Sequence, residues 1–103
     1  MADPMRIRAV ANGDTVEVKI LMRHDMETGL RKDPSGKIIP AHHIKTLVAK
    51  WNGKVVFDAL LGPSVSKDPF LSFKFKGAAK GDKVAVTWVD NTGDTRTDEA
   101  AIG

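Results

Sequence analysis

The sequence contains no cysteine and no tyrosine among its 103 residues, and its aromatic side chains are four phenylalanines and two tryptophans. Without cysteine the chain can form no disulfide, thiolate metal site or thiol nucleophile, although this does not fix its compartment. Apolar runs are short, and none reaches the length that crosses a membrane. No secretory leader is recognisable, because Met1-Ala2-Asp3-Pro4 leads directly into the first predicted strand. Taken alone, this start predicts a cytoplasmic protein.

The chain also has only a small net charge. The formal net charge is +3, and lysines and arginines are scattered along the chain instead of forming a block. A protein that binds single-stranded nucleic acid needs a basic groove with exposed aromatic platforms, and the sequence shows neither. We therefore expect no nucleic-acid partner and no membrane partner. The length and the apolar content of 42% fit one folded domain over residues 1–103.

Strand patterns recur along the chain, and no segment shows a helical period. Two Asn-Gly turns predict hairpins over residues 5–22 and 44–61. Three further strands are predicted over 70–76, 83–90 and 95–99, the last at a sheet edge. About seven short antiparallel strands predict an all-β, immunoglobulin-like β-sandwich. An open barrel is the alternative, because strand count and spacing do not separate the two.

The first predicted hairpin has one apolar face and one wet face. Its inward residues are Met5, Ile7, Ala9, Val16, Val18 and Ile20. Pairing across a turn at Asn12-Gly13 places Arg8 directly opposite Glu17 on the wet face.

The second predicted hairpin is apolar on both faces. With Trp51 opposite Lys54 across the turn, the core face carries Ile44, Val48, Val55, Phe57, Ala59 and Leu61. The other face is predicted to be a surface for another protein, and its apolar residues are Leu47, Ala49, Trp51, Val56 and Leu60. Two alternatives stay open: a connection or the C-terminal tail of the same chain covers this face, or a bulged turn exchanges the faces of one strand.

A long polar connection joins the two hairpins, and connections of this length are usually functional or mobile. It runs through Arg23-His24-Asp25-Met26-Glu27-Thr28-Gly29-Leu30-Arg31 and later Ile39-Pro40-Ala41-His42. These stretches resemble the His-x-Met-Glu-Thr-Gly-x-Arg and Ile-Pro-Ala-His signature of the SoxZ family. Its members are the smaller subunits of the SoxYZ sulfur carrier of bacterial thiosulfate oxidation, and the resemblance covers the whole chain.

The resemblance implies a subunit that is not an enzyme, holds no cofactor and pairs with SoxY as a heterodimer. A cysteine on a C-terminal Gly-Gly-Cys-Gly-Gly segment of SoxY carries the sulfur intermediates, which the pair presents to SoxAX, SoxB and the sulfur dehydrogenase. It also implies a periplasmic location by co-export with SoxY, in place of the cytoplasmic expectation. The lack of cysteine fits, because a second thiol would exchange with the sulfur-charged one. Without SoxY, the apolar face predicts self-association.

All three histidines, His24, His42 and His43, border the long connection. Met22 and Met26 flank His24, so a copper-handling domain with a Met/His site is an alternative function. No ligand spacing here is diagnostic, and we predict no metal site and no catalytic residues. His42 and His43 should point to opposite sides of a strand. A cytoplasmic immunoglobulin-like adaptor is a further alternative.

The same connection supplies the residues expected near the SoxY segment or the docking enzymes. They are Arg23, His24, Met26, Arg31, Lys32 and His42. Arg31 is expected to pair locally with Asp33 or Glu27. The functional alternative is a cationic rim of Arg23, Arg31 and Lys32 that attracts sulfur oxyanions and docking enzymes.

Overall fold

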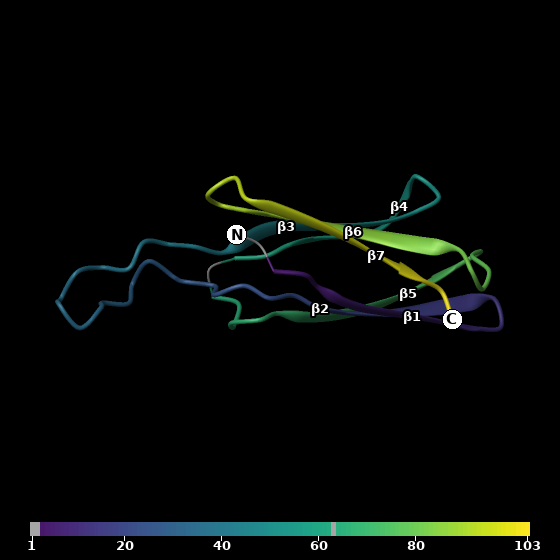
Figure 1. The fold of residues 1–103 in the computed structure, drawn as a ribbon, viewed down its shortest axis with the longest axis horizontal. Coiled ribbons are helices and arrows are strands. Elements are labelled where there is room, and N and C mark those ends of the chain that lie inside the picture. Colours follow the sequence, from purple (N-terminus) through teal and green to yellow (C-terminus); the bar gives the residue numbers. More distant parts are fainter. Residues whose placement is uncertain (1–2, 63) are drawn as a thin grey trace.

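The computed structural model describes residues 3–62 and 64–103, which form seven strands in two facing sheets (Figure 1). One sheet has the order β1-β2-β5, and the other has the order β4-β3-β6-β7. The strands are β1 Arg6–Asn12, β2 Thr15–Leu21, β3 Ile44–Trp51, β4 Lys54–Leu60, β5 Phe70–Lys76, β6 Lys83–Asp90 and β7 Thr95–Ala101. All pairings within the sheets are antiparallel, which confirms the all-β sandwich. Within this described part, no helix is long and apolar enough to span a bilayer.

The core lies between the two sheets and is built from alternate residues of the central strands. Side chains of β2 and β6 that are at most 1% exposed are Val16, Val18, Ile20, Val84, Val86 and Trp88. Because successive strand residues point to opposite faces, the alternation in the sequence suffices to place them inward. Burying each of these large side chains stabilises the fold by about 1.5–3 kcal/mol.

The first hairpin keeps its predicted faces but not its predicted register. Its turn falls on Gly13-Asp14, so Arg8 lies opposite Lys19 and the predicted Arg8–Glu17 pair is wrong. The partner of Arg8 moves by two residues, and a slip of two leaves every side chain on its original face. The Glu17 carboxylate instead lies 3.7 Å from the Lys19 ammonium group.

The second hairpin departs from the prediction by a slip of one residue. Trp51 lies opposite Lys54 as predicted, but a bulge follows and Ala49 pairs with Phe57, which leaves Val56 as the extra residue. A slip of one exchanges the two faces of β3 beyond the bulge. Val48, predicted in the core, therefore lies opposite the exposed Asp58.

This bulge corrects the predicted partner face. Leu47 and Ala49 are fully buried in the core of their own molecule, so neither can contact a partner. Trp51 and Val56 are partly buried against the same core, and the Trp51 Nε1 donates to Asp82 at 3.0 Å. Of the five predicted residues, Leu60 alone is exposed, at 88%.

Residues 23–43 leave the sandwich as a two-legged extension, here called the 23–43 ribbon (Figure 1). Its legs are joined by antiparallel bridges between Glu27 and His42 and between Lys32 and Ile38. At the tip, the Asp33 carboxylate accepts hydrogen bonds from the backbone N–H groups of Ser35 and Lys37. The ribbon gives the molecule a long axis of 54 Å against 20 and 19 Å across.

The two sides of the sandwich differ. On the side of β1 and β7, the C-terminal segment closes the gap, because Gly103 donates to the Ala9 carbonyl at 2.9 Å and accepts from the Ala11 N–H at 2.8 Å. On the opposite side, β4 and β5 are the outermost strands. Phe57 and Phe73 stack there with ring centroids 4.5 Å apart and planes at 3°. The C-terminal tail therefore does not cover the second hairpin.

Candidate functional site at the root of the ribbon

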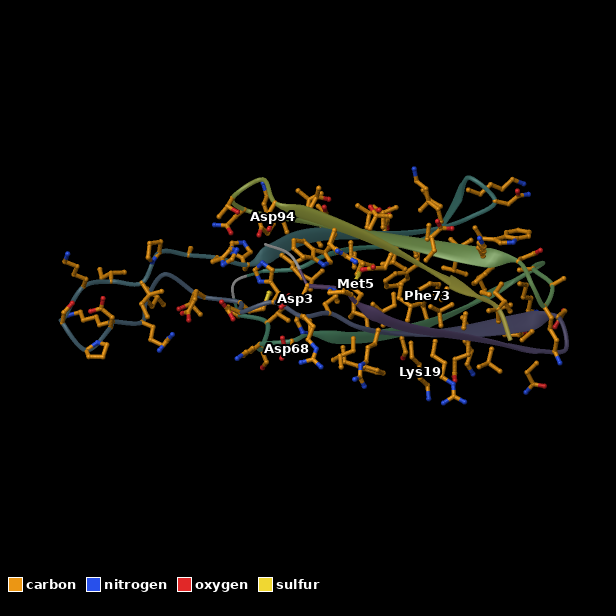
Figure 2. All side chains as sticks on the ribbon, in the orientation of Figure 1. Asp3, Met5, Lys19, Asp68, Phe73 and Asp94 are labelled. Carbon is orange, nitrogen blue, oxygen red and sulfur yellow. The ribbon has the colours of Figure 1, made fainter. Side chains whose placement is uncertain are left out.

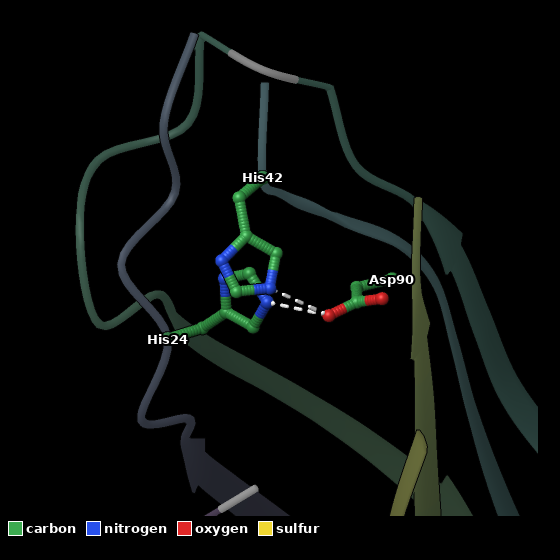
Figure 3. A group of neighbouring side chains, drawn as sticks. All are labelled: His24, His42 and Asp90. Carbon is green, nitrogen blue, oxygen red and sulfur yellow. Dashed lines mark hydrogen bonds and ion pairs between the residues drawn. The ribbon is translucent and has the colours of Figure 1, made fainter. Parts of the chain in front are cut away.

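Three side chains from distant parts of the chain meet where the 23–43 ribbon joins the sandwich (Figure 3). His24 belongs to the first leg, His42 to the second leg, and Asp90 ends β6. The Nε2 atoms of His24 and His42 lie 3.1 and 2.9 Å from the same atom, Asp90 Oδ2. The two rings are neighbours, with centroids 4.3 Å apart. One carboxylate oxygen therefore fastens both legs to β6.

Asp90 is 2% exposed, and its second oxygen is also fully used. Oδ1 accepts hydrogen bonds from the Thr92 N–H at 2.9 Å, the Thr92 hydroxyl at 2.7 Å and the Asp94 N–H at 3.0 Å. Burial by itself raises the pKa of this carboxyl group. The bonds from Thr92, His24 and His42 outweigh burial, so the pKa of Asp90 lies well below its ordinary value of 3.8. Asp90 is therefore an anion at neutral pH.

The surroundings of His24 fix the position of its proton. Its Nδ1 lies 3.2 Å from the Met26 backbone nitrogen, and a backbone N–H can only donate. Nδ1 is therefore an acceptor, and Nε2 carries the hydrogen that is donated to Asp90. The backbone N–H of His24 also donates to Asp68, at 3.0 Å, and Trp88 packs against the ring edge-on. These contacts fix the orientation of the His24 ring, with Nδ1 as the acceptor and Nε2 as the donor.

Two imidazoles and a carboxylate are ligands that zinc accepts, and these three donor atoms all lie within 4.8 Å of one another. A metal on His24 Nε2 requires the ring proton to move to Nδ1, where it would meet the N–H of Met26. Metal-bound histidines normally donate their other nitrogen to an acceptor, and here a donor occupies that place. The donor set therefore fits a hydrogen-bonded cluster and does not fit a metal centre.

The two methionines of the Met/His copper alternative are part of the apolar core. Met22 and Met26 are 0% and 5% exposed within the apolar core. The Met26 sulfur accepts a hydrogen bond from the Ile44 N–H at 3.3 Å. The His42 ring turns toward Asp90, and the backbone N–H of His43 donates to the Asn91 side chain at 2.8 Å.

The six ribbon residues predicted to lie near a partner fall into two groups. His24, Met26 and His42 gather at the root, where the first two are buried and the His42 side chain is 39% exposed. Arg31 and Lys32 lie exposed farther along the ribbon, so these six side chains do not form one site. Arg23 is exposed beside the root.

Arg31 is paired within the ribbon. Its Nε donates to a carboxylate oxygen of Glu27 at 3.1 Å, and its Nη2 also contacts Glu27. The local pair with Glu27 is confirmed, whereas the alternative partner Asp33 holds the tip turn. Because Glu27 neutralises Arg31, the three predicted cations do not form a joint rim.

An open pocket of about 280 Å³ lies beside the cluster. Its charged lining consists of Asp3, Asp25, Asp68 and Asp94 together with Arg23 and Lys67 (Figure 2 labels Asp3, Asp68 and Asp94). Four carboxylates outnumber two cations, so the pocket does not favour a sulfur oxyanion.

Asp90 is the central residue that the sequence did not reveal. Asp90 begins the run Asp90-Asn91-Thr92-Gly93-Asp94, and this run is typical of an ordinary turn after a strand. Nothing in that run indicates two histidines 66 and 48 residues away.

Fold and site together define an immunoglobulin-like β-sandwich in which a buried polar cluster fastens a projecting ribbon. The family described as "Sulphur oxidation protein SoxZ" matches residues 5–101. The chain therefore belongs to the SoxZ family of sulfur-oxidation proteins. No curated protein matches the sequence.

Solved structures show the same fold at low sequence identity. A hypothetical protein, PH1083, from Pyrococcus horikoshii has a TM-score of 0.65 and 20% identity, covering 99% of this chain and 89% of its own. A superoxide reductase (neelaredoxin) variant from Archaeoglobus fulgidus has a TM-score of 0.61 and 23% identity, covering 97% of this chain and 89% of its own. At these identities the likeness extends to the fold alone.

Proposed function

We propose that this chain is the non-catalytic subunit of a SoxYZ sulfur carrier. In this role it binds SoxY as a heterodimer and helps present the sulfur intermediates on the SoxY cysteine to SoxAX, SoxB and the sulfur dehydrogenase. The observation that supports the proposal is the family match over residues 5–101. The sequence contains no cysteine, so the thiol that carries sulfur must belong to the partner.

The geometry of the ribbon root agrees with a scaffold. Asp90 holds both legs through His24 and His42. Both ring nitrogens of His24 and the Nε2 atom of His42 take part in hydrogen bonds. A ribbon fixed at its root offers a partner a surface of defined direction, which reduces the ordering cost of binding. We further propose a periplasmic location, reached by export together with SoxY.

Co-expression tests the proposal directly. We expect the chain to co-purify with tagged SoxY in a 1:1 complex by native mass spectrometry, and to be needed for turnover of thiosulfate-loaded SoxY by the Sox enzymes. The control is tagged SoxY expressed without this chain. Failure of the untagged chain to co-purify, or full turnover by SoxY alone, would overturn the proposal.

Location has its own test. The chain should appear in the periplasmic fraction when SoxY carries its leader and remain in the cytoplasm when that leader is deleted. Export that is independent of the SoxY leader would contradict co-export while leaving the heterodimer intact.

A further inference from the structure

The outer face of the three-stranded sheet concentrates positive charge. Alternate residues of β1, β2 and β5 point away from the core, and the charged ones among them are Arg6, Arg8, Glu17, Lys19, Lys74 and Lys76. All five cations are exposed, and Figure 2 labels Lys19, which projects from this sheet away from the other one. Five cations and one carboxylate give this basic face a charge of +4, which exceeds the net charge of +3 of the whole chain.

The strand register places two of these cations against each other. Arg8 lies directly opposite Lys19. Like charges at opposite positions of an antiparallel pair destabilise it, so this arrangement does not serve the fold. Among the described residues, no carboxylate oxygen lies within 4.0 Å of Arg6, Arg8 or Lys76. These three cations are therefore free to meet a partner.

The single carboxylate of the basic face is shared. Glu17 lies 3.7 Å from the Lys19 ammonium group and 3.9 Å from that of Lys74. All three side chains are at least 45% exposed, and ion pairs of this kind contribute little to stability. Glu17 can balance at most one of the two lysines, so the positive excess remains.

The outer face of the four-stranded sheet gives a contrast. The charged residues at its paired, outward positions are two of each sign: Lys50, Asp58, Lys83 and Glu99. Lys45 at the β3 bulge and Lys54 beside the turn lie at the ends of this sheet. Even when both are counted, the excess is two positive charges against four on the basic face. The charge excess therefore singles out one side of the sandwich.

We propose that the basic face docks an acidic surface on an enzyme that acts on the loaded carrier. The choice of this face rests on its charge, and the choice of an enzyme as the partner rests on the function proposed above. Complementary charge raises association rates and fixes orientation more than it adds affinity. This suits a carrier, which must meet several enzymes in turn and leave each one again.

The chemistry of the face favours a protein over a lipid surface or a nucleic acid. Glu17 lies in the central strand, between Val10 and Lys74, where a uniformly anionic surface would repel it. On the same face, Val10 and Phe70 are 40% and 58% exposed. Arginine and aromatic side chains are enriched at protein interfaces. A protein can offer carboxylates, a cation opposite Glu17 and apolar contact within one surface.

Two matched double variants test the docking face. Arg8→Gln with Lys19→Gln removes two charges from the basic face, and Lys50→Gln with Lys83→Gln removes two from the other sheet. All four positions are exposed, so both variants should stay folded by circular dichroism. The melting temperature of the first should not fall, because the like-charge contact is lost.

Each variant is then assembled with SoxY, and association with SoxAX, SoxB and the sulfur dehydrogenase is measured by surface plasmon resonance. At low salt, we expect the first variant to slow association with at least one enzyme by about fivefold or more. The control should stay within about twofold of the unchanged complex. The difference should shrink as salt is added, because exposed charges are screened.

The other outcomes separate this inference from the carrier proposal. If both variants associate with every enzyme as fast as the unchanged complex, the docking face is wrong and the carrier proposal stands. If the first variant no longer binds SoxY, SoxY itself occupies this face and the inference is overturned. Tighter binding of phosphatidylglycerol vesicles or duplex DNA than of any enzyme, lost in the first variant, would also overturn it. If the unchanged chain does not bind SoxY at all, both proposals fail.

Discussion

The Nε2 atom of His42 lies 2.9 Å from Oδ2 of Asp90, although the two residues are 48 positions apart. This contact joins the second leg of the 23–43 ribbon to the end of β6, and His24 does the same for the first leg. Both histidines depend on one buried carboxylate. The direction of the whole ribbon should therefore be sensitive to a change at that single side chain.

Replacing Asp90 with asparagine tests this dependence. The amide has one acceptor atom and two N–H donors, so it cannot accept from the histidines and from Thr92 as the carboxylate does. We expect Asp90→Asn to lower the free energy of unfolding by about 1–3 kcal/mol in urea titrations. We also expect faster amide exchange at both legs of the ribbon. Asp58→Asn, at an exposed position of β4, is the control and should leave both measurements unchanged.

Acid should weaken the same contact. The pKa of Asp90 is lower in the folded chain than its ordinary value of 3.8, so its ionised form stabilises the fold above that value. This contribution is lost progressively as the pH falls below about 4, because the unfolded chain then takes up a proton at Asp90 while the folded chain still holds the carboxylate ionised. We expect the difference in unfolding free energy between the unchanged chain and Asp90→Asn to shrink progressively below pH 4. A difference that stays constant from pH 7 to pH 2 would contradict this account.

Metal ions should have little effect on the cluster. Because Met26 donates to His24 Nδ1, binding of zinc at Nε2 would first have to break that bond. We expect no stoichiometric zinc or copper after gel filtration and no change in melting temperature on addition of a chelator. His42→Gln is a useful comparison, because it removes one of the three donor atoms while leaving a polar side chain. Tight zinc binding that His42→Gln abolishes would show that the ring of His24 can reorganise.

Because of the bulge in the second hairpin, two of its leucines differ in solvent exposure. Leu47 is 0% exposed and Leu60 is 88% exposed, although a regular hairpin would place both on one face. We expect Leu47→Ala to cost about 2–5 kcal/mol of stability, because it leaves a cavity in the core. Leu60→Ala should change stability by less than about 0.5 kcal/mol. Equal effects in thermal and urea unfolding would contradict the register described here.

The two hairpins show which part of the fold the sequence can predict. The alternation of apolar residues predicts Val16 and Val18 in the core, and this prediction is correct. The turn is shifted by one position, but each residue's cross-strand partner then moves by two positions, so no side chain changes face. The same reasoning failed at Leu47 and Ala49, where one extra residue, Val56, exchanged the faces of β3. A bulge depends on how two strands twist and pack in three dimensions, and a pattern of apolar residues does not reveal it.

The ribbon root shows why the candidate site was harder to predict. The motif around His24 and His42 stands out in the sequence, and the two rings do lie together, with centroids 4.3 Å apart. Their common partner Asp90 comes from the far end of β6, and its turn sequence resembles many others. Contacts between residues so far apart follow from the order of strands in the sheets, which local patterns leave undetermined.

The hydrogen bonds between Gly103 and β1 have a practical consequence for anyone who labels this chain. A fluorophore or fusion joined to Gly103 starts beside Ala9 and Ala11, across the molecule from Leu60. It would report on that flank and leave the surface around Leu60 free for binding assays. The chain's lack of cysteine also allows a single engineered thiol at either flank to be labelled without a competing reaction.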